Sequence, residues 1–126
     1  MTYTVKTVRI IIVDDSAYFR TSLTRFLSVE YDFKIVGSAQ DGIQLIKLLQ
    51  SIHADVVLMD LQMPNMSGLE ATEYLRANFP DIKIIVLTSF DSTGNIIQLC
   101  KLGVKSFVDK KDIDNLPKAI RHIKNG

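Results

Sequence analysis

The stretch VRIIIV at residues 8–13 is short, apolar and rich in β-branched side chains, and it ends abruptly at Asp14 and Asp15. Such a run is typical of a β-strand that is buried on both faces of a sheet. Strands of this kind occur mainly in parallel sheets whose two faces are covered by helices. The stretch therefore predicts that the rest of the chain alternates between further buried strands and amphipathic helices.

The predicted alternation continues along the chain. Apolar runs that stop at polar residues predict further strands at residues 33–37, 56–59, 83–87 and 106–108. Helical patterns predict helices at residues 17–28, 41–49, 67–78, 92–102 and 115–124. Phe19 begins the apolar stripe of the first of these helices. Five strand–helix repeats predict an α/β fold, in which a five-stranded parallel sheet carries helices on both faces.

Several helix ends carry recognisable signals. Asp15 or Ser16 can cap the first helix, because a short polar side chain there accepts a hydrogen bond from an otherwise unpaired backbone N–H. Ser67 and Glu70 have the spacing of a capping box. Gly103 is placed to end the fourth helix.

The composition predicts a single soluble domain. The chain has 126 residues and a formal net charge of +1, which gives no reason to expect direct contact with a nucleic acid or an anionic membrane. Its single cysteine, Cys100, excludes an internal disulfide and a cysteine-based zinc cluster. No apolar run approaches the roughly 20 residues that span a bilayer, and no signal-peptide core is present. We therefore expect one cytoplasmic domain over residues 1–126, with its core at about residues 8–124.

Polar side chains that can bind a ligand or take part in a reaction follow four of the predicted strands. Asp14 and Asp15 follow the first strand, Asp60 the third, Thr88 the fourth and Lys110 the fifth. In an open α/β sheet, ligands bind beyond the carboxyl ends of the strands. Capping alone would explain either of the first two aspartates, but not five polar residues at four strand ends. We therefore expect these side chains to converge on one site.

Three neighbouring carboxylates repel one another and raise the pKa of at least one of them. A divalent cation relieves this repulsion, and clustered carboxylate oxygens with a backbone carbonyl and water suit Mg²⁺. The ammonium group of Lys110 is a second source of positive charge.

Four blocks of sequence carry a resemblance to a known family. They are IVDDS at residues 12–16, VLMDLQMPNMSG at 57–68, VLTS at 86–89 and GVKSFVDK at 103–110. Together they resemble the receiver domains of bacterial two-component response regulators, particularly those of LuxR/NarL type. The resemblance covers nearly the whole chain. It implies a flavodoxin-like (βα)5 fold whose strands lie in the order 2-1-3-4-5.

The resemblance assigns roles to the residues at the strand ends. It implies that Asp60 is the phosphoacceptor. Asp14, Asp15, Asp60 and the backbone carbonyl of Gln62 are then the expected ligands of Mg²⁺. Lys110 is expected to pair with the oxygens of the phosphoryl group.

Further residues correspond to the family's switch. Thr88 resembles the hydroxyl that hydrogen-bonds the phosphoryl group, and Phe107 stands at the aromatic position that turns inward when that hydroxyl moves. Ser89 replaces the small Ala or Gly that is usual in the family. Gln62 and Phe90 occupy positions that tune the lifetime of the phosphorylated state in the family.

The implied activity is signalling. A sensor histidine kinase or phosphotransfer protein would donate the phosphoryl group, and the domain would catalyse only its own phosphorylation and dephosphorylation. The change would alter the surface of the fourth helix, fifth strand and fifth helix, with a homodimer as one activated form. The end of the chain resembles regulators that continue into a LuxR-type helix-turn-helix domain, which implies control of transcription by an output domain or partner.

Three other functions fit parts of the pattern. A phosphatase with an aspartyl phosphate intermediate would need a second aspartate two residues after Asp60, where this chain has Gln62. A flavin-binding module would need a phosphate-binding loop after the first strand, where Asp14 and Asp15 would repel a phosphate. A degenerate receiver would act by protein binding alone, although all five active-site positions here hold competent residues.

Overall fold

The computed structural model describes residues 6–89 and 93–125. Strands and helices alternate along this part of the chain, in the order β1 (Val8–Val13), α1 (Ala17–Ser28), β2 (Phe33–Ala39), α2 (Gly42–Leu49), β3 (Val56–Asp60), α3 (Gly68–Asn78), β4 (Lys83–Thr88), α4 (Thr93–Lys101), β5 (Ser106–Asp109), the 3₁₀ helix η1 (Lys110–Asn115) and α5 (Leu116–Asn125). No helix in the described ranges combines the length and the apolar character that a bilayer crossing requires.

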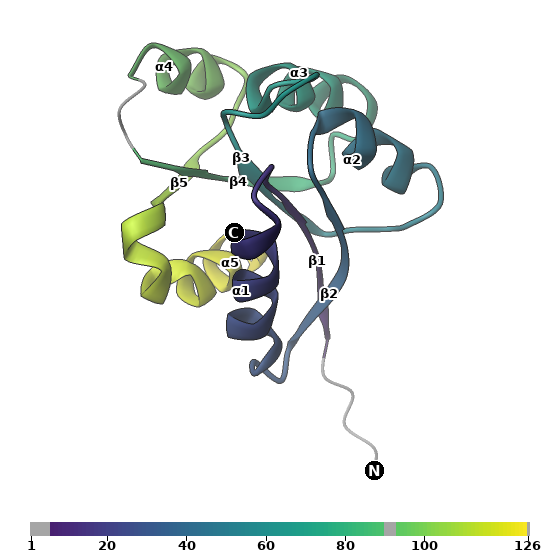
Figure 1. The fold of residues 1–126 in the computed structure, drawn as a ribbon, viewed down its shortest axis with the longest axis vertical. Coiled ribbons are helices and arrows are strands. Elements are labelled where there is room, and N and C mark those ends of the chain that lie inside the picture. The colour runs from purple at the N-terminus through teal and green to yellow at the C-terminus, as the bar shows by residue number, and fades with distance from the viewer. Residues whose placement is uncertain (1–5, 90–92, 126) are drawn as a thin grey trace.

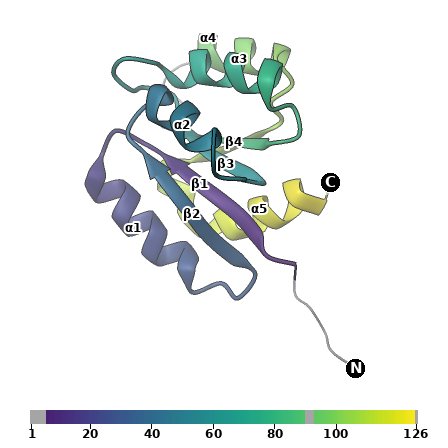
Figure 2. The ribbon, with the colours of Figure 1, turned by 90° about the vertical axis from the view of Figure 1, so that its right-hand side faces the viewer.

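The strands form one sheet in the order β2-β1-β3-β4-β5, and every neighbouring pair is parallel. Helices α1 and α5 lie against one face, while α2, α3 and α4 cover the other (Figures 1 and 2). This arrangement confirms the predicted fold class and the predicted strand order.

The core lies in two layers, one on each face of the sheet. Successive side chains of β1 point to opposite faces, so that Ile10 and Ile12 pack in the layer under α1 and α5, whereas Ile11 and Val13 pack in the other layer. All four are at most 1% exposed. Burying each such side chain contributes about 1.5–3 kcal/mol. The run of β1 is apolar without interruption because both of its faces are buried, as the sequence predicted.

Helix ends follow the predicted signals closely. The side chains of Ser16 and Asp41 each accept a hydrogen bond from the backbone N–H three residues further on, at 3.2 and 2.9 Å. Ser67 and Glu70 form the capping box at the start of α3. Gly103 follows α4 with a φ of 94°, a left-handed conformation that favours glycine.

Some boundaries differ from the prediction. Strand β2 extends to Ala39, and β3 and β4 include Asp60 and Thr88. The 3₁₀ helix η1 was not predicted, because its mixed residues have no apolar period and its first turn depends on the Asp109 side chain, which accepts a hydrogen bond from a backbone N–H at 2.8 Å. Residue 92, the predicted start of the fourth helix, lies outside the described ranges.

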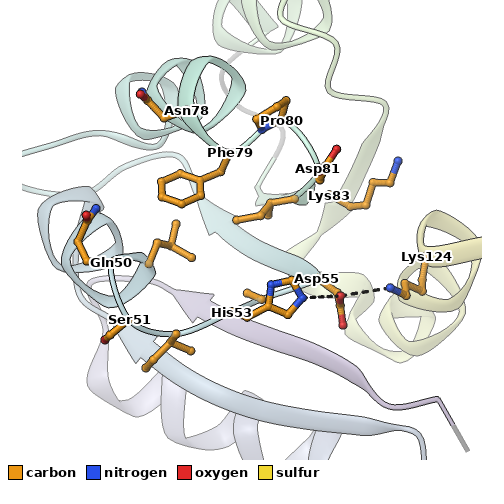
Figure 3. Close-up of a pocket in the computed structure, with 14 residues that line it drawn as sticks. Gln50, Ser51, His53, Asp55, Asn78, Phe79, Pro80, Asp81, Lys83 and Lys124 are labelled. Atoms are coloured by element: carbon orange, nitrogen blue, oxygen red, sulfur yellow. Dashed lines mark ion pairs between the residues drawn. The ribbon is translucent and has the colours of Figure 1, made fainter.

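The amino edge of the sheet holds a cavity of about 610 Å³ (Figure 3). Beside it, the carboxylate of Asp55 accepts a hydrogen bond from the backbone N–H of Arg9 at 2.9 Å and pairs with His53 at 3.4 Å and with Lys124 at 3.2 Å. Burial pushes the pKa of Asp55 up, but the Arg9 N–H and the Lys124 ammonium outweigh burial and hold it below its ordinary value. Asp55 thus ties the end of α5 to the sheet, on the edge opposite the strand ends that carry the predicted site.

A second polar cluster fastens α5 to the turn before β2. The guanidinium of Arg121 donates to both carboxylate oxygens of Asp32 at 2.9 and 2.7 Å, and to Glu30 at 2.6 Å. It also lies over the ring of Phe33, 4.7 Å from the centroid. The hydrogen bond from Arg121 holds the pKa of Asp32 below its ordinary value.

We predict that Arg121→Gln lowers the free energy of unfolding at pH 7 by about 1 kcal/mol, the upper range for partly exposed ion pairs. Because the pKa of Asp32 is lowered in the folded state, the ion pair adds stability above the pKa of an unfolded aspartate, about 4. That contribution is lost as the pH falls through the folded-state pKa. Urea unfolding of both proteins between pH 7 and pH 3 should therefore show the difference shrinking in acid.

Arg25→Gln is the control, because Arg25 is an exposed residue of α1. Its effect should be small and should not follow the titration of a carboxylate. A difference between wild type and Arg121→Gln that stays constant or grows below pH 4 would contradict the assignment.

Candidate functional site

The residues that follow the strands meet at the carboxyl edge of the sheet. The register aligns Val13 with Met59, so that Asp14 follows β1 beside Asp60, the last residue of β3. Asp60 in turn is aligned with Leu87, the residue before Thr88 at the end of β4. Parallel pairing in register therefore brings side chains together that are far apart in the sequence, as predicted.

Three carboxylates form the centre of this edge. One oxygen from each of Asp14, Asp15 and Asp60 lies within 4.8 Å of the other two. Asp14 is only 1% exposed and Asp60 only 6%, whereas Asp15 is exposed. The cluster is thus buried at its base and open to solvent on the side of Asp15.

The ammonium group of Lys110 lies against this cluster. Its Nζ is 2.8 Å from Asp14 Oδ2 and 3.3 Å from Asp60 Oδ1. Burial lowers the pKa of Lys110, but its hydrogen bond to Asp14 and the charge of Asp60 outweigh burial and raise the pKa above its ordinary value. Lys110 is therefore held in its charged form by the carboxylates that it contacts.

The negative charge of the Asp60 carboxylate is only partly balanced by its neighbours. Burial and the negative charge of Asp14 raise its pKa, while Lys110 and the backbone N–H of Gln62 act in the opposite direction without restoring the ordinary value. A single ammonium group does not balance three carboxylates. The site is therefore suited to an additional positive charge.

The first turn of α1 supports the cluster. The backbone N–H of Ser16 donates to Asp14 Oδ1 at 2.9 Å, and Arg20 Nη1 donates to the backbone oxygen of Asp14 at 2.6 Å. The ring of Phe19 lies 4.8 Å from Lys110 Nζ, a cation–π contact. The sequence placed Phe19 only in an apolar stripe. Its position one helical turn after Asp15 is the signal that could have placed it at this edge.

A cavity of about 300 Å³ opens over these groups. Most of the predicted site residues line it, namely Asp15, Asp60, Gln62, Thr88, Ser89 and Lys110, together with Leu61. It is smaller than the cavity at the amino edge, but two of the three clustered carboxylates, Asp15 and Asp60, line it. Asp15, Asp60 and the polar groups around them therefore share one solvent-accessible cavity.

Two predicted residues, Phe107 and Asp14, are not among those that line this cavity. Phe107 lies on β5 opposite Val86 and does not line the cavity; it is half-buried and packs against the layer under α2, α3 and α4. Phe90 lies outside the described residues. Asp14 is almost fully buried and contacts Lys110.

The donor set suits a hard divalent cation. Carboxylate oxygens are available from Asp14, Asp15 and Asp60, and Gln62 lines the same cavity. Mg²⁺ binds through one or two carboxylates and keeps several of its waters, which needs an open face of the kind that Asp15 provides. The residues of the site therefore offer the type of ligand that Mg²⁺ binds.

Gly68 allows α3 to begin directly against Asp60. A Cβ on Gly68 would overlap the Asp60 carbonyl oxygen and would lie 2.8 Å from Leu61 Cα. The backbone N–H of Gly68 also donates to the Leu61 carbonyl at 3.0 Å, and Thr72 Oγ1 donates to the Gly68 carbonyl at 2.7 Å. The position of Asp60 thus depends on the absence of a side chain at residue 68.

Comparison with known proteins gives one family. Residues 10–121 match the family described as the response regulator receiver domain. The transcriptional regulatory protein DegU of Brevibacillus brevis is 33% identical over 120 residues, which are 94% of this chain and 51% of DegU. The oxygen regulatory protein NreC of Staphylococcus epidermidis is 35% identical over 120 residues, covering 94% of this chain and 55% of NreC. The chain thus spans about half the length of these relatives.

Solved structures show the same fold. The response regulator domain of Thermotoga maritima CheB superposes with a TM-score of 0.88 at 28% identity, over 96% of this chain and 98% of that one. The isolated REC domain of RcsB from Salmonella enterica serovar Typhimurium, determined in the presence of phosphomimetic BeF3-, gives 0.88 at 27% identity, over 96% and 91% of the two chains.

We predict that Gly68→Ala lowers the free energy of unfolding by about 1–3 kcal/mol, the usual cost of overpacking. The reason is that the new methyl group meets backbone atoms of Asp60 and Leu61, which cannot move without displacing the end of β3. Gly37→Ala is a matched control, because its Cβ meets side-chain atoms alone, the flexible end of Leu48 at 3.3 Å and Ile11 Cγ1 at 3.9 Å.

Chemical denaturation measures both variants, and amide NMR spectra report where the backbone shifts. The shifts in Gly68→Ala should be centred on Asp60 and Leu61. Equal stability of the two alanine variants, or unchanged signals around Asp60, would show that the close contact at Gly68 is not a constraint.

Proposed function

Because the chain belongs to the family of response regulator receiver domains, which are signalling domains rather than metabolic enzymes, we propose that it is a phosphorylation-dependent switch in which Asp60 accepts a phosphoryl group. The observation that carries this proposal is the meeting of three carboxylates within 4.8 Å, two of them in contact with Lys110. Such a cluster is electrostatically unfavourable unless cations balance its charge.

The proposed reaction is phosphoryl transfer from a phosphohistidine or a small acyl phosphate. A carboxylate oxygen of Asp60 forms a bond to phosphorus, while the bond between phosphorus and the donor atom breaks and its electron pair leaves with the donor. The product is a mixed anhydride on Asp60. Transfer of this kind needs in-line positioning and stabilisation of the charge on the phosphoryl oxygens rather than further covalent chemistry.

The charged groups of the cavity suit these needs. Lys110 is held in its charged form beside Asp60 and can turn its ammonium group to the transferred oxygens. Asp14, Asp15, Asp60 and the carbonyl of Gln62 would hold Mg²⁺, which when bound supplies positive charge to the phosphoryl oxygens. The buried Asp14 would keep Lys110 in place through their contact, and Asp15 is exposed to solvent.

The switch is proposed for the end of β4 and for β5. Thr88 and Ser89 line the cavity and can donate hydroxyl hydrogen bonds to a phosphoryl group on Asp60. Movement of Thr88 would free space next to Phe107, which is half-buried on the neighbouring strand. The added charge would then shift the population of two pre-existing states, and with it the surface formed by α4, β5 and α5.

Partners and output follow from the family. We propose that residues 1–126 are one cytoplasmic receiver domain with its core at about residues 8–124, that a histidine kinase or phosphotransfer protein phosphorylates it, and that it can dimerise when activated. Because relatives of about twice its length are named as transcriptional regulators, we propose that the signal controls transcription. With a net charge of +1, this domain needs no direct contact with nucleic acid.

A phosphatase acting on external substrates is less well supported. Such an enzyme would need an acid or base two residues after the nucleophile, but Gln62 there carries an amide that does not titrate. The cavity therefore offers a phosphoacceptor without the group that would drive rapid turnover.

We predict that incubation with acetyl phosphate and Mg²⁺ adds the mass of one phosphoryl group to the intact protein. Asp60→Asn should abolish this addition, because an amide oxygen is a poor nucleophile. Lys110→Met should slow it by about 10²-fold, the usual loss when one charge-stabilising donor is removed. Intact mass spectrometry at several times after mixing measures all three.

Asp81→Asn is the control, since it removes an exposed aspartate beside the cavity at the amino edge. It should be phosphorylated like wild type. A mass gain that persists in Asp60→Asn would sink the phosphoacceptor assignment. In the same phosphorylated sample, NMR signals of the Phe107 ring should shift, and unchanged ring signals would contradict the switch.

A further inference from the structure

A third buried aspartate, Asp41, lies outside the carboxylate cluster. Asp41 is 3% exposed and precedes α2. Its Oδ1 accepts a hydrogen bond from the backbone N–H of Gln44 at 2.9 Å, which caps the helix. Its Oδ2 accepts a hydrogen bond from Asn65 Nδ2, also at 2.9 Å, from a position 24 residues further along the chain. One carboxylate therefore joins the start of α2 to the loop that follows β3.

Asn65 has the backbone conformation that this connection requires. Its φ of 66° lies in the left-handed region, which is uncommon for residues other than glycine but which asparagine tolerates well. Asn65 belongs to the loop of residues 61–67, between the end of β3 and the capping residue of α3. The same loop contains Gln62, whose carbonyl is an expected ligand of the cation.

The two loops also touch through their backbones. The backbone N–H of Gly42 donates to the carbonyl of Met66 at 3.3 Å, and a Cβ on Gly42 would lie 2.7 Å from the Met66 side chain. A side chain at residue 42 would therefore require the Met66 side chain to move. The side-chain bond of Asn65 to Asp41 and the backbone bond of Met66 to Gly42 hold adjacent residues of the loop against the same helix start.

We propose that the hydrogen bond between Asp41 and Asn65 is a latch that positions the loop of residues 61–67 for cation binding at the carboxylate cluster. Asp41 and Asn65 are positioning residues, since the cluster is formed by other side chains. The latch limits how far the Gln62 backbone moves relative to Asp60, the fixed end of the loop on β3. This inference rests on the proposed function, because it assumes that Mg²⁺ binds at the cluster.

The expected size of the effect follows from other metal sites. Groups that orient a ligand without touching the metal change its affinity by about 10–100-fold when they are removed. Loss of the latch should also raise the mobility of the loop, because Asn65 would no longer be joined to the buried carboxylate.

Two single variants and their combination test the latch in the 126-residue chain. Asn65→Gly removes the side-chain amide but keeps the positive φ, since glycine adopts it freely. Asp41→Ser keeps a side chain that can cap α2 but removes the oxygen that Asn65 reaches. Amide NMR spectra recorded during a titration with MgCl₂ give the apparent dissociation constant, and hydrogen exchange of residues 61–67 gives the mobility.

Each variant should weaken Mg²⁺ binding about 10-fold or more and should speed exchange in the loop. The double variant should lose little more than either single variant, because all three break the same bond. Asn78→Ala is the control, because it removes an exposed asparagine that bonds the Tyr74 carbonyl at 3.0 Å at the end of α3. It should bind Mg²⁺ like wild type.

The outcomes separate the latch from the function on which it rests. If wild type binds Mg²⁺ and both single variants bind it equally well, the latch is overturned and the proposed function stands. Losses that add fully in the double variant would also overturn the latch, since they would mean that Asp41 and Asn65 act independently. If wild type itself binds no Mg²⁺, the cation site of the proposed function fails and the role of the latch fails with it.

Discussion

Repulsion among three carboxylates at one end of the sheet is the constraint on which the rest of the structure depends. Asp14 and Asp60 are almost fully buried, and each lies within reach of the other and of Asp15. Lys110 offsets part of this repulsion through contacts of 2.8 and 3.3 Å, but it leaves the pKa of Asp60 raised. Isolated buried charges are costly, so a fold that keeps this arrangement must draw its stability from elsewhere.

That stability comes from the strands that lead to the site. Ile10, Ile11, Ile12 and Val13 fill both core layers and end where the charges begin. The end of each central strand is therefore rigid, and rigid elements hold catalytic geometry better than loops do. The polar edge consists of the polar side chains at the carboxyl ends of these apolar strands. The opposite edge has paired charges around Asp55, which ties α5 to the sheet.

Much of this arrangement was predictable from the sequence, because it depends on local periodicity and on one topological rule. Buried runs predicted the strands, polar residues at helix starts predicted the caps, and parallel pairing placed Asp14, Asp60 and Lys110 on one edge. Contacts set by the packing of distant segments were not predictable. The ring of Phe19 over Lys110 depends on how α1 crosses the sheet, and the bond from Asn65 to Asp41 joins loops 24 residues apart. The helical spacing of Phe19 places it near this edge but not over Lys110, and the bond between Asn65 and Asp41 has no periodic signal in the sequence.

The central claim is that Asp60, one of the three clustered carboxylates, accepts the phosphoryl group. Borohydride reduction tests it most directly, because an aspartyl phosphate is reduced to homoserine while a free aspartate is not. The protein would be treated with acetyl phosphate and Mg²⁺, reduced, digested and sequenced by tandem mass spectrometry. The account predicts homoserine at position 60 and at no other aspartate. Homoserine at position 14 or 15, or a stable phosphoryl group on any other residue with none at 60, would contradict it.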